Sequence, residues 1–415
     1  MRRSPTPALA GQDPRRLRAA RTGVAVVFGL NGLAVATWFA RIPTARDDLS
    51  ISAGRLGLVL LAMSAGAVLA MSTAGAAVHR LGPARVVVGS TALVAAGLTV
   101  TGLGVGAWAS IPVTAAGLFA LGYGSGSCDV AMNVEAAAVE RKLARTVMPR
   151  FHAAWSLGTV AGGGLGAASA HAGMSIAAHL PVIAVVVLIG TVLGARAFLP
   201  TPADATPAGR TPADATHGDA GGGSGVLAAW REPRTLLVGL FVLVMAFTEG
   251  TANDWIGVAF VDGYGFSEAA GAAVFGLFVG AMTLGRLFGT VALDRWGRVP
   301  VLTATIGLAV GGVLLAVLAG SGLLGLIGVA LWGVGASLGF PVGMSAAADD
   351  EDRAAARVSV VAMIGYTAFL AGPPLVGLLG DRFGTLRALL IVPVLLLAAL
   401  LLVPAIRRPA PDDGP

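Results

Sequence analysis

Twelve apolar runs, each long enough to cross a lipid bilayer as a helix, alternate with short polar segments along the chain. At a rise of 1.5 Å per residue, about 20 helical residues span about 30 Å of hydrocarbon. The pattern predicts an all-helical integral membrane protein whose twelve transmembrane helices form two six-helix halves related by pseudo-two-fold symmetry. The first six runs are residues 22–41, 55–78, 85–107, 112–135, 151–170 and 177–199, and the second six are 235–261, 269–292, 299–319, 322–345, 358–379 and 386–406.

The break between the two sets of runs has the composition of a flexible linker. Residues 201–206 and 211–216 have the same sequence, and only Gly and Ser occupy 221–225. No apolar pattern in this segment can pack into a core. We therefore divide the chain into an N-terminal tail 1–21, a first half 22–199, a linker 200–234, a second half 235–406 and a C-terminal tail 407–415.

The composition agrees with lipid as the solvent for most of the chain. Hydrophobic residues make up 56% and charged residues only 12%, and the mean hydropathy is +0.82. A soluble domain of this composition has too few polar groups to cover its surface. Glycine is abundant inside the apolar runs, as expected where membrane helices pack closely through small residues. The single cysteine, Cys128, excludes a disulfide framework within one chain.

Basic residues concentrate on one side of the predicted spans. With the N-terminus inside, 22 of the 28 Lys and Arg residues fall on the inner side, and Arg286 lies within a run. Cytoplasmic loops carry such an excess, so we expect a protein of the cell membrane with both termini and the linker in the cytoplasm. Membrane lipid is an expected partner of the chain. The basic residues are scattered along it, so we expect no binding of nucleic acid. The five basic residues on the outer side are Arg41, Arg46, Arg55, Arg382 and Arg387.

The two sets of runs repeat each other at nearly constant spacing. Residues 79–82, after the second run, match 294–297 after the eighth run at an offset of 215. The Gly-x-Gly of residues 122–124 matches 333–335 at an offset of 211. The two arginines 141 and 145 match 353 and 357 at an offset of 212. Three matches at similar offsets predict the duplication of a six-helix unit.

The loop residues of this repeat resemble the signature of the major facilitator superfamily of transporters, G-x-x-x-D-R-x-G-R-R/K. The second copy supplies Asp294, Arg295, Gly297 and Arg298. The first copy supplies Gly75, Arg80 and Gly82, with His79 in the place of the acid. The resemblance implies that these eight residues have gating or structural roles.

Four further motifs resemble the MosC-like, rhizopine-associated branch of this superfamily. They are residues 38–43, 129–133, 151–158 and 249–255. The resemblance implies that the first, fourth, seventh and tenth spans line a central cavity. It therefore places Asn31, Trp38 and Arg41 of the first span on the pathway of the substrate. For Arg41, capture of an anion and contact with lipid headgroups are equally compatible with the sequence.

Two acid and amide pairs lie inside the fourth and seventh runs. Asp129 and Asn133 are one turn apart on one helix face, and Glu249 and Asn253 have the same spacing. Ionisable groups inside a membrane are costly and mark ion or substrate pathways. Neither acid has a basic residue within one turn, so we expect unpaired carboxylates that bind protons or substrate. The alternative is that the carboxylates cap backbone groups or join two helices.

Other candidates have two readings each. Asp254 and Trp255 belong to the pathway by resemblance, although a Trp near the end of a span is commonly an anchor in the membrane interface. Trp332 of the tenth run either stacks on a ligand or packs in the core. Glu135, beside a basic loop, is expected to be solvated or paired in a gate. Arg286 should have an acidic partner, and we favour a structural ion pair over direct contact with substrate.

These features together predict a transporter. The resemblance implies alternating access for a small polar organic solute, sugar- or cyclitol-like, with protons as coupling ion. Two alternatives stay open, a proton-driven exporter of amphipathic drugs or toxic metabolites and a membrane sensor or scaffold without transport. Converging acids and amides in the cavity favour the first reading, whereas an aromatic and apolar lining favours export. No P-loop, zinc spacing or nucleophile elbow is present, so we expect no enzyme, cofactor or bound metal.

Overall fold

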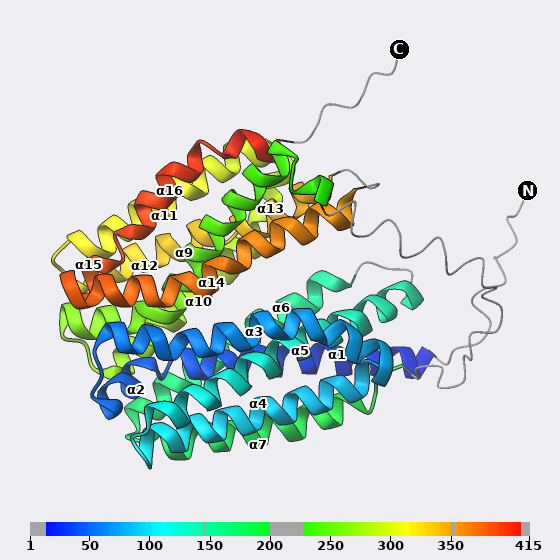
Figure 1. Ribbon diagram of the computed structural model, residues 1–415, viewed down its shortest axis with the longest axis horizontal. Coiled ribbons are helices and arrows are strands. Elements are labelled where there is room, and N and C mark those ends of the chain that lie inside the picture. Colours follow the sequence, from blue (N-terminus) through cyan, green and yellow to red (C-terminus); the bar gives the residue numbers. More distant parts are fainter. Residues whose placement is uncertain (1–13, 144–146, 200–226, 350–352, 408–415) are drawn as a thin grey trace, which may run out of the picture.

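The computed structural model describes residues 14–143, 147–199, 227–349 and 353–407, which are almost entirely helical (Figure 1). The first half contains α1 (Pro14–Phe39), α2 (Ile42–Leu49), α3 (Ala53–Leu81), α4 (Pro83–Gly106), α5 (Ile111–Leu143), α6 (Met148–His171) and α7 (Ile176–Ala195). The second half contains α9 (Pro233–Tyr264), α10 (Glu268–Trp296), α11 (Arg298–Leu318), α12 (Gly322–Ala336), α13 (Gly339–Ala347), α14 (Ala354–Phe383), α15 (Thr385–Ala388), α16 (Ile391–Leu400) and the 3₁₀ turn η2 (Val403–Ile406).

Each predicted apolar run coincides with a helix or with consecutive short helices. The run 322–345 is divided between α12 and α13, and the run 386–406 between α15, α16 and η2. Within the described residues, nine helices are long and apolar enough to cross a membrane. Helices α5 and α6 are long enough but are rich in Gly, Ser and ionisable residues, which lowers their hydropathy. The all-helical membrane fold is confirmed, and the count of twelve spans stays a prediction.

Helices α3 and α10 show the internal repeat in detail. The bounds of α10 are those of α3 shifted by 215 residues. Each helix starts at a serine, Ser52 or Ser267, whose hydroxyl accepts the backbone N–H three residues further on. Each ends at a glycine with positive φ, 81° at Gly82 and 79° at Gly297, a conformation in which side chains are strained. The backbone conformation at the end of each helix therefore explains why both copies of the signature have a glycine at this position.

The repeat extends to the packing between helices. A Cβ on Gly122 of α5 would clash with the carbonyl oxygen of Met63 in α3. The equivalent Gly333 of α12 lies in the same way against the carbonyl oxygen of Phe278 in α10. Both glycines let two backbones approach closely, as membrane helices do at small residues.

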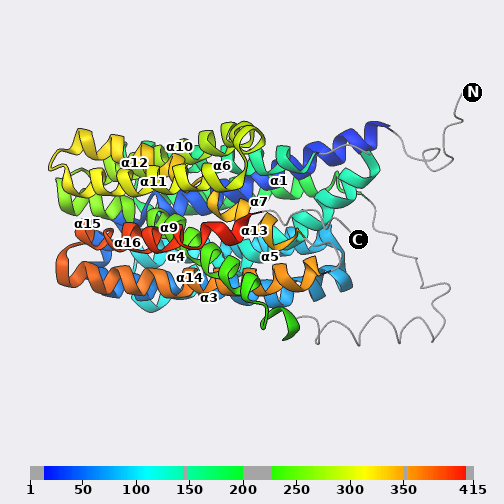
Figure 2. The same ribbon diagram turned by 90° about the horizontal axis from the view of Figure 1, so that it is seen from above.

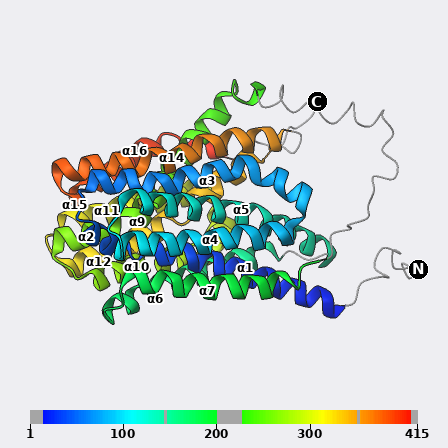
Figure 3. The same cartoon turned by 60° about the horizontal axis from the view of Figure 1, so that its bottom comes forward.

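The two halves meet along two helix pairs, α3 with α14 and α6 with α10 (Figures 2 and 3). Figure 1 shows the halves converging at the end of the bundle that carries α2 and diverging at the opposite end. We call these the α2 end and the Pro14 end, after the helix α2 and the first residue of α1.

Polar contacts join the halves at the α2 end. Thr44 of α2 donates to Glu268, which begins α10, and Arg46 of α2 forms an ion pair with Asp262 of α9. Ser52 donates to Asp381 of α14 at 3.0 Å. Acidic side chains of the second half thus accept hydrogen bonds from side chains of the first half. These contacts close the bundle at this end.

Candidate functional site

A cavity of about 1380 Å³ lies between the halves, which diverge toward the Pro14 end. Its polar lining consists of Asp129, His152, Ser156, Glu249, Thr283, Arg286 and Thr290. Its apolar lining includes Phe28, Trp155, Leu287, Phe340, Met344 and Phe369. Toward the mouth the lining residues are Asp294, Arg298, Ser345 and Arg407. The cavity therefore has both hydrogen-bonding groups and aromatic surfaces, as sites for small organic molecules do.

An ion pair occupies the second-half wall of this cavity. Arg286 Nη2 of α10 lies 2.9 Å from Glu249 Oε2 of α9, and Arg286 Nε donates to the carbonyl of Ser337 at 3.3 Å. The expectation that Glu249 is unpaired is wrong, because its partner comes from a neighbouring helix. The expectation of an acidic partner for Arg286 is confirmed. The two side chains remain 17% and 28% exposed, so both charges face the cavity and are accessible to a solute.

Asp129 of α5 lies on the first-half wall and has no basic partner within the described residues. Asn133 donates its Nδ2 to Asp129 Oδ1 at 3.2 Å and to the Asp129 carbonyl oxygen at 2.9 Å. This amide therefore orients the carboxylate and does not itself line the cavity. Asn253 makes no corresponding bond to Glu249 in the part of the chain that is described. The expected symmetry between the two acid and amide pairs thus applies to spacing and not to contacts.

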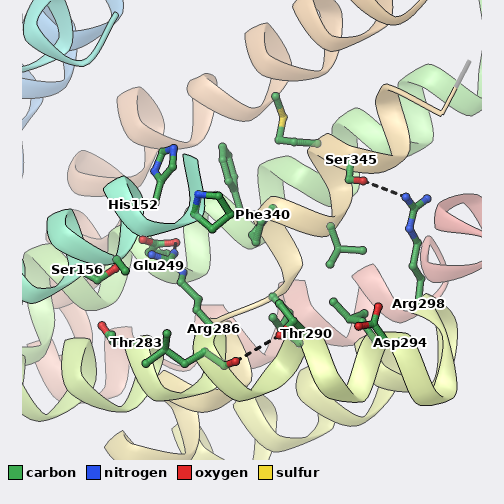
Figure 4. A pocket seen from close by; sticks show the side chains of 18 of the residues that line it. His152, Ser156, Glu249, Thr283, Arg286, Thr290, Asp294, Arg298, Phe340 and Ser345 are labelled. Carbon is green, nitrogen blue, oxygen red and sulfur yellow. Dashed lines mark hydrogen bonds and ion pairs between the residues drawn. The ribbon is translucent and has the colours of Figure 1, made fainter. Parts of the chain in front are cut away.

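His152 is a cavity residue that was not among the predicted pathway residues, because a lone histidine in a membrane helix is more commonly a packing residue. It projects from α6 into the cavity beside Glu249 and Arg286 (Figure 4). Its ring lies edge-on against Phe28, with centroids 5.3 Å apart. Ser156, one turn further along α6, lines the same wall. Both residues belong to the motif Phe151–Gly158, but only the packing of α6 shows which residues of this motif face the cavity.

The three tryptophans predicted on the pathway lie in the protein core. Trp38, Trp255 and Trp332 are fully buried, and Trp332 packs edge-on against Phe278 with centroids 5.5 Å apart. Trp255 is therefore not an interface anchor, and Trp332 has packing as its observed role. None of the three lines the cavity.

Arg41 and Asn31 are also buried away from the cavity. Arg41 is 2% exposed, and its Nη2 donates to the carbonyl of Met174 at 2.9 Å. The reading in which it reaches lipid headgroups is wrong, because burial within the first half prevents it. Asn31 accepts a hydrogen bond from Ser125 at 3.1 Å and so joins α1 to α5. Asp254, like Asn253, is half-buried on α9 and lies outside the lining of the cavity.

Glu135 is a structural residue in this conformation. Its side chain is buried, and its Oε1 accepts the backbone N–H of Leu199 at 2.7 Å, which holds the end of the first half against α5. The prediction that Glu135 is solvated is wrong. The adjacent basic loop provided a plausible environment in sequence, but the segment after α7 covers the carboxylate instead.

The two copies of the loop signature differ in their contacts. Arg298 of the second copy donates to both oxygens of Asp349 at 2.9 Å and to Ser345 at 2.9 Å. Asp294, Gly297 and Arg298 line the mouth of the cavity, and Arg295 stacks over Trp296. In the first copy, Gly75, His79 and Arg80 are exposed, and Gly82 ends α3. The gating roles of both copies stay predictions.

Two helical halves around a cavity with charged and apolar lining residues, closed at one end and open at the other, are the architecture of a secondary transporter. The chain belongs to the Major Facilitator Superfamily, whose family model matches residues 24–366 and 256–415. It is a multi-pass membrane transporter and not an enzyme.

Curated relatives cover nearly the whole chain. It is 33% identical over 368 residues to an uncharacterized transporter, y4wD, of Sinorhizobium fredii, an alignment that covers 88% of this chain and 93% of that protein. It is 28% identical over 372 residues to the membrane protein MosC of Rhizobium meliloti, with 89% and 86% covered. The resemblance to MosC is confirmed.

Solved structures share the fold. The nucleoside transporter NupG has a TM-score of 0.71 and 13% identity, with 93% of this chain and 98% of that chain covered. A variant of the E. coli fucose:proton symporter FucP has a TM-score of 0.60 and 15% identity, with 94% and 98% covered. At such identities the likeness establishes the fold alone.

Proposed function

We propose that the protein carries a small polar organic solute, sugar- or cyclitol-like, across the cell membrane by alternating access, coupled to protons. The observation that carries this proposal is the Glu249 and Arg286 ion pair, which faces Asp129 and His152 across a cavity between the two halves. Carboxylates, a guanidinium and hydroxyls together offer donors and acceptors at several positions, as a polyhydroxylated solute requires.

The aromatic lining supports the same class of solute. Phe28, Phe340 and Phe369 provide flat apolar surfaces beside the polar groups. A sugar or cyclitol ring has a C–H face that packs on such a surface while its hydroxyls bond to Ser156 or Thr283. The names of the structural neighbours agree, since a nucleoside and fucose both carry several hydroxyls on a ring.

Proton coupling is supported by the charges in the cavity. Asp129 has no basic partner in the described residues, and Glu249 has one partner that a proton on the carboxylate would release. A carboxylate in a partly dehydrated cavity binds a proton more readily than it does in water. Arg286 would then be free to bind the solute, which links the two events. FucP, a proton symporter by name, has the same fold.

The proposed orientation places the Pro14 end in the cytoplasm, so the conformation described here faces inward. The charge asymmetry supports both termini and the linker on that side. The division into two halves joined by a linker is part of the same proposal, although residues 200–226 of that linker lie outside the described structure.

Export of amphipathic compounds is the second candidate. The apolar lining residues, among them Leu287, Met344 and Phe340, favour it, and no Asn or Gln of the described residues lines the cavity. Against it stands the number of charged groups, which an amphipathic ligand would leave unpaired. A sensor would bind the solute without transporting it. The test below distinguishes this case from a transporter.

A ligand-stabilisation screen followed by transport tests the proposal. A ligand that binds the folded protein at 100 times its Kd stabilises it by about 2.7 kcal/mol, which is a measurable rise in melting temperature. We expect stabilisation by a sugar, cyclitol or nucleoside, and pH-gradient-driven uptake of that compound into proteoliposomes. Stabilisation by hydrophobic cations alone would support the exporter, and stabilisation without flux would support the sensor.

A further inference from the structure

A second pocket, of about 280 Å³, lies outside the central cavity at the Pro14 end. It is formed by residues 21–25 of α1 and by the first turn of α6, two helices that pack against each other. Its lining residues are Arg21, Thr22, Ala25, Val147, Arg150 and Phe151. No residue is shared with the lining of the central cavity, so the pocket is a separate feature.

Two arginines without acidic partners flank this pocket. Arg21 and Arg150 are exposed, and neither guanidinium has a hydrogen bond or ion pair within the described part of the chain. The neighbouring acid is Glu140, whose carboxylate accepts the backbone N–H groups of Val147 and Met148 at 2.7 Å. Glu140 thus holds the start of α6 and leaves both guanidinium groups available to an anion.

Exposed apolar side chains follow the cationic pocket along α1 and α6. On α1, Val26 follows Thr22 by one turn and is 39% exposed. On α6, Leu157 follows Arg150 by two turns on the same face and is 67% exposed, and Leu165 beyond it is 44% exposed. Two arginines at the end of an exposed apolar surface match the chemistry of a phospholipid, with its anionic headgroup above an acyl chain.

The position along the helices fits this ligand. The apolar run of α1 begins at residue 22 and that of α6 at residue 151, so both arginines lie where the hydrocarbon region ends. Guanidinium groups bind phosphate oxygens in a bidentate manner, and basic pockets between helices at this depth bind anionic headgroups.

We propose that Arg21 and Arg150 form a binding site for one anionic phospholipid, with the phosphate between the two guanidinium groups and an acyl chain along the exposed apolar side chains of α1 and α6. The site does not depend on which solute the transporter carries. Because α6 also supplies His152 and packs on α10, the bound lipid stabilises the helix that forms one wall of the central cavity.

Thermal stability of the purified full-length protein tests the site. Detergent-solubilised protein is titrated with phosphatidylglycerol, with phosphatidylcholine of the same acyl chains, and with inorganic phosphate. We expect the first to raise the melting temperature and the other two to have little effect. The double variant R21A/R150A should bind phosphatidylglycerol roughly 25-fold more weakly, and each single variant about fivefold, from the usual contribution of one basic residue near a membrane surface.

Matched variants separate this site from general attraction to a basic surface. R85A/R231A removes two exposed arginines of the Pro14 end outside the pocket and should retain the full response. R21K/R150K keeps the charges without the bidentate geometry and should retain part of it. Equal responses of R21A/R150A and R85A/R231A would overturn the site, and stabilisation by inorganic phosphate alone would overturn the assignment to lipid. If R21A/R150A is not recovered, the two single variants decide between the same outcomes.

Discussion

Two carboxylates, Asp129 and Glu249, lie in the cavity away from its mouth, and in the described residues Glu249 has a basic partner whereas Asp129 has none. Glu249 is bound by Arg286 at 2.9 Å, whereas the carboxylate of Asp129 is oriented only by the amide of Asn133. Removal of one member of a buried ion pair leaves an uncompensated charge in a medium that solvates it poorly. In the proposed mechanism, protonation of Glu249 or binding of a solute releases Arg286 from this pair.

Glu249→Gln is predicted to abolish proton-driven accumulation while solute binding and exchange remain measurable. The amide keeps the size of Glu and one acceptor for Arg286 but cannot release a proton. If one proton moves per solute, a gradient of about one pH unit drives about tenfold accumulation in the parent protein. The variant should only equilibrate the solute, which pH-gradient-driven uptake and equilibrium binding on the same preparation would measure.

Asp129→Asn tests the symmetric position on α5. It also removes a cavity carboxylate, but one that has no basic partner within the described residues. If Glu249 only joins α9 to α10, E249Q should accumulate solute normally, and that result would refute the assignment. If Glu249 binds a cationic solute directly, binding itself should be lost in E249Q.

At the scale of single residues, sequence reasoning located the acids and could not locate their partners. The acid and amide spacing identified Asp129 and Glu249, because one helix fixes which side chains share a face. The partner of Glu249 lies on another helix, and its approach depends on how α9 and α10 pack. The prediction that the tryptophans line the pathway was wrong for a related reason. Burial of Trp38 and Trp255 depends on neighbouring helices that no local pattern specifies.

At the scale of elements, the start of α9 is held to the start of α14 by one acid. Glu232, just before α9, accepts hydrogen bonds from Arg357 at 2.6 Å, Thr235 at 2.9 Å and Arg353 at 3.0 Å. The hydrogen bond from Arg357 is the main reason that the pKa of Glu232 is lowered to about 2, with smaller contributions from Thr235 and Arg353. The ionised form is thus favoured in the folded protein.

Glu232→Gln is predicted to lower stability in a pH-dependent manner. Because the folded-state pKa lies below the unfolded value near 4.5, the ionised carboxylate stabilises the fold fully above that value. This contribution is lost as the pH falls toward 2. The difference in melting temperature between parent and variant should therefore be constant above pH 5 and shrink below it. R353A, whose side chain is 65% exposed, should show little loss at any pH, and a difference for E232Q that does not change with pH would contradict the prediction.

The elements themselves were largely predictable, with one informative exception. Long apolar runs gave the positions of the membrane helices, because the thickness of the hydrocarbon fixes their length. Helix α2 was missed, since its eight residues include Arg46, Asp47 and Asp48 and read as a polar loop. The division of the tenth and twelfth runs into shorter helices was also missed, because apolar composition does not show where a helix ends.

At the scale of the whole molecule, the inner and outer sides are assigned from charge alone. Reporter fusions at Pro415 and within residues 203–221 are predicted to be active only in the cytoplasm, because basic residues are retained on that side during insertion. Activity of either fusion on the outer side would refute the topology and would make the open end of the cavity face outward.

The closed state depends on contacts that cross between the halves at the α2 end. Arg46 of α2 binds Asp262 of α9, and Asp262 also accepts a hydrogen bond from Thr385 at 2.7 Å. Alternating access requires these contacts to break when the other end closes. Side-chain exposures of 21% and 30% place the ion pair among partly solvated pairs, each of which contributes about 1 kcal/mol or less.

Arg46→Ala is therefore predicted to shift the population toward a state open at the α2 end by up to about fivefold. Spin labels on A107C and L323C, at exposed positions of the two halves at this end, report the separation by pulsed electron resonance. The single native cysteine, Cys128, is buried and should not react. Arg55→Ala is the matched control, because Arg55 is exposed near α2 and its side chain has no partner across the halves in the described residues. A larger fraction of long distances in R46A but not in R55A would support the role of the ion pair in closure. An unchanged distribution in R46A would show that Thr44 and Ser52 are sufficient to keep this end closed.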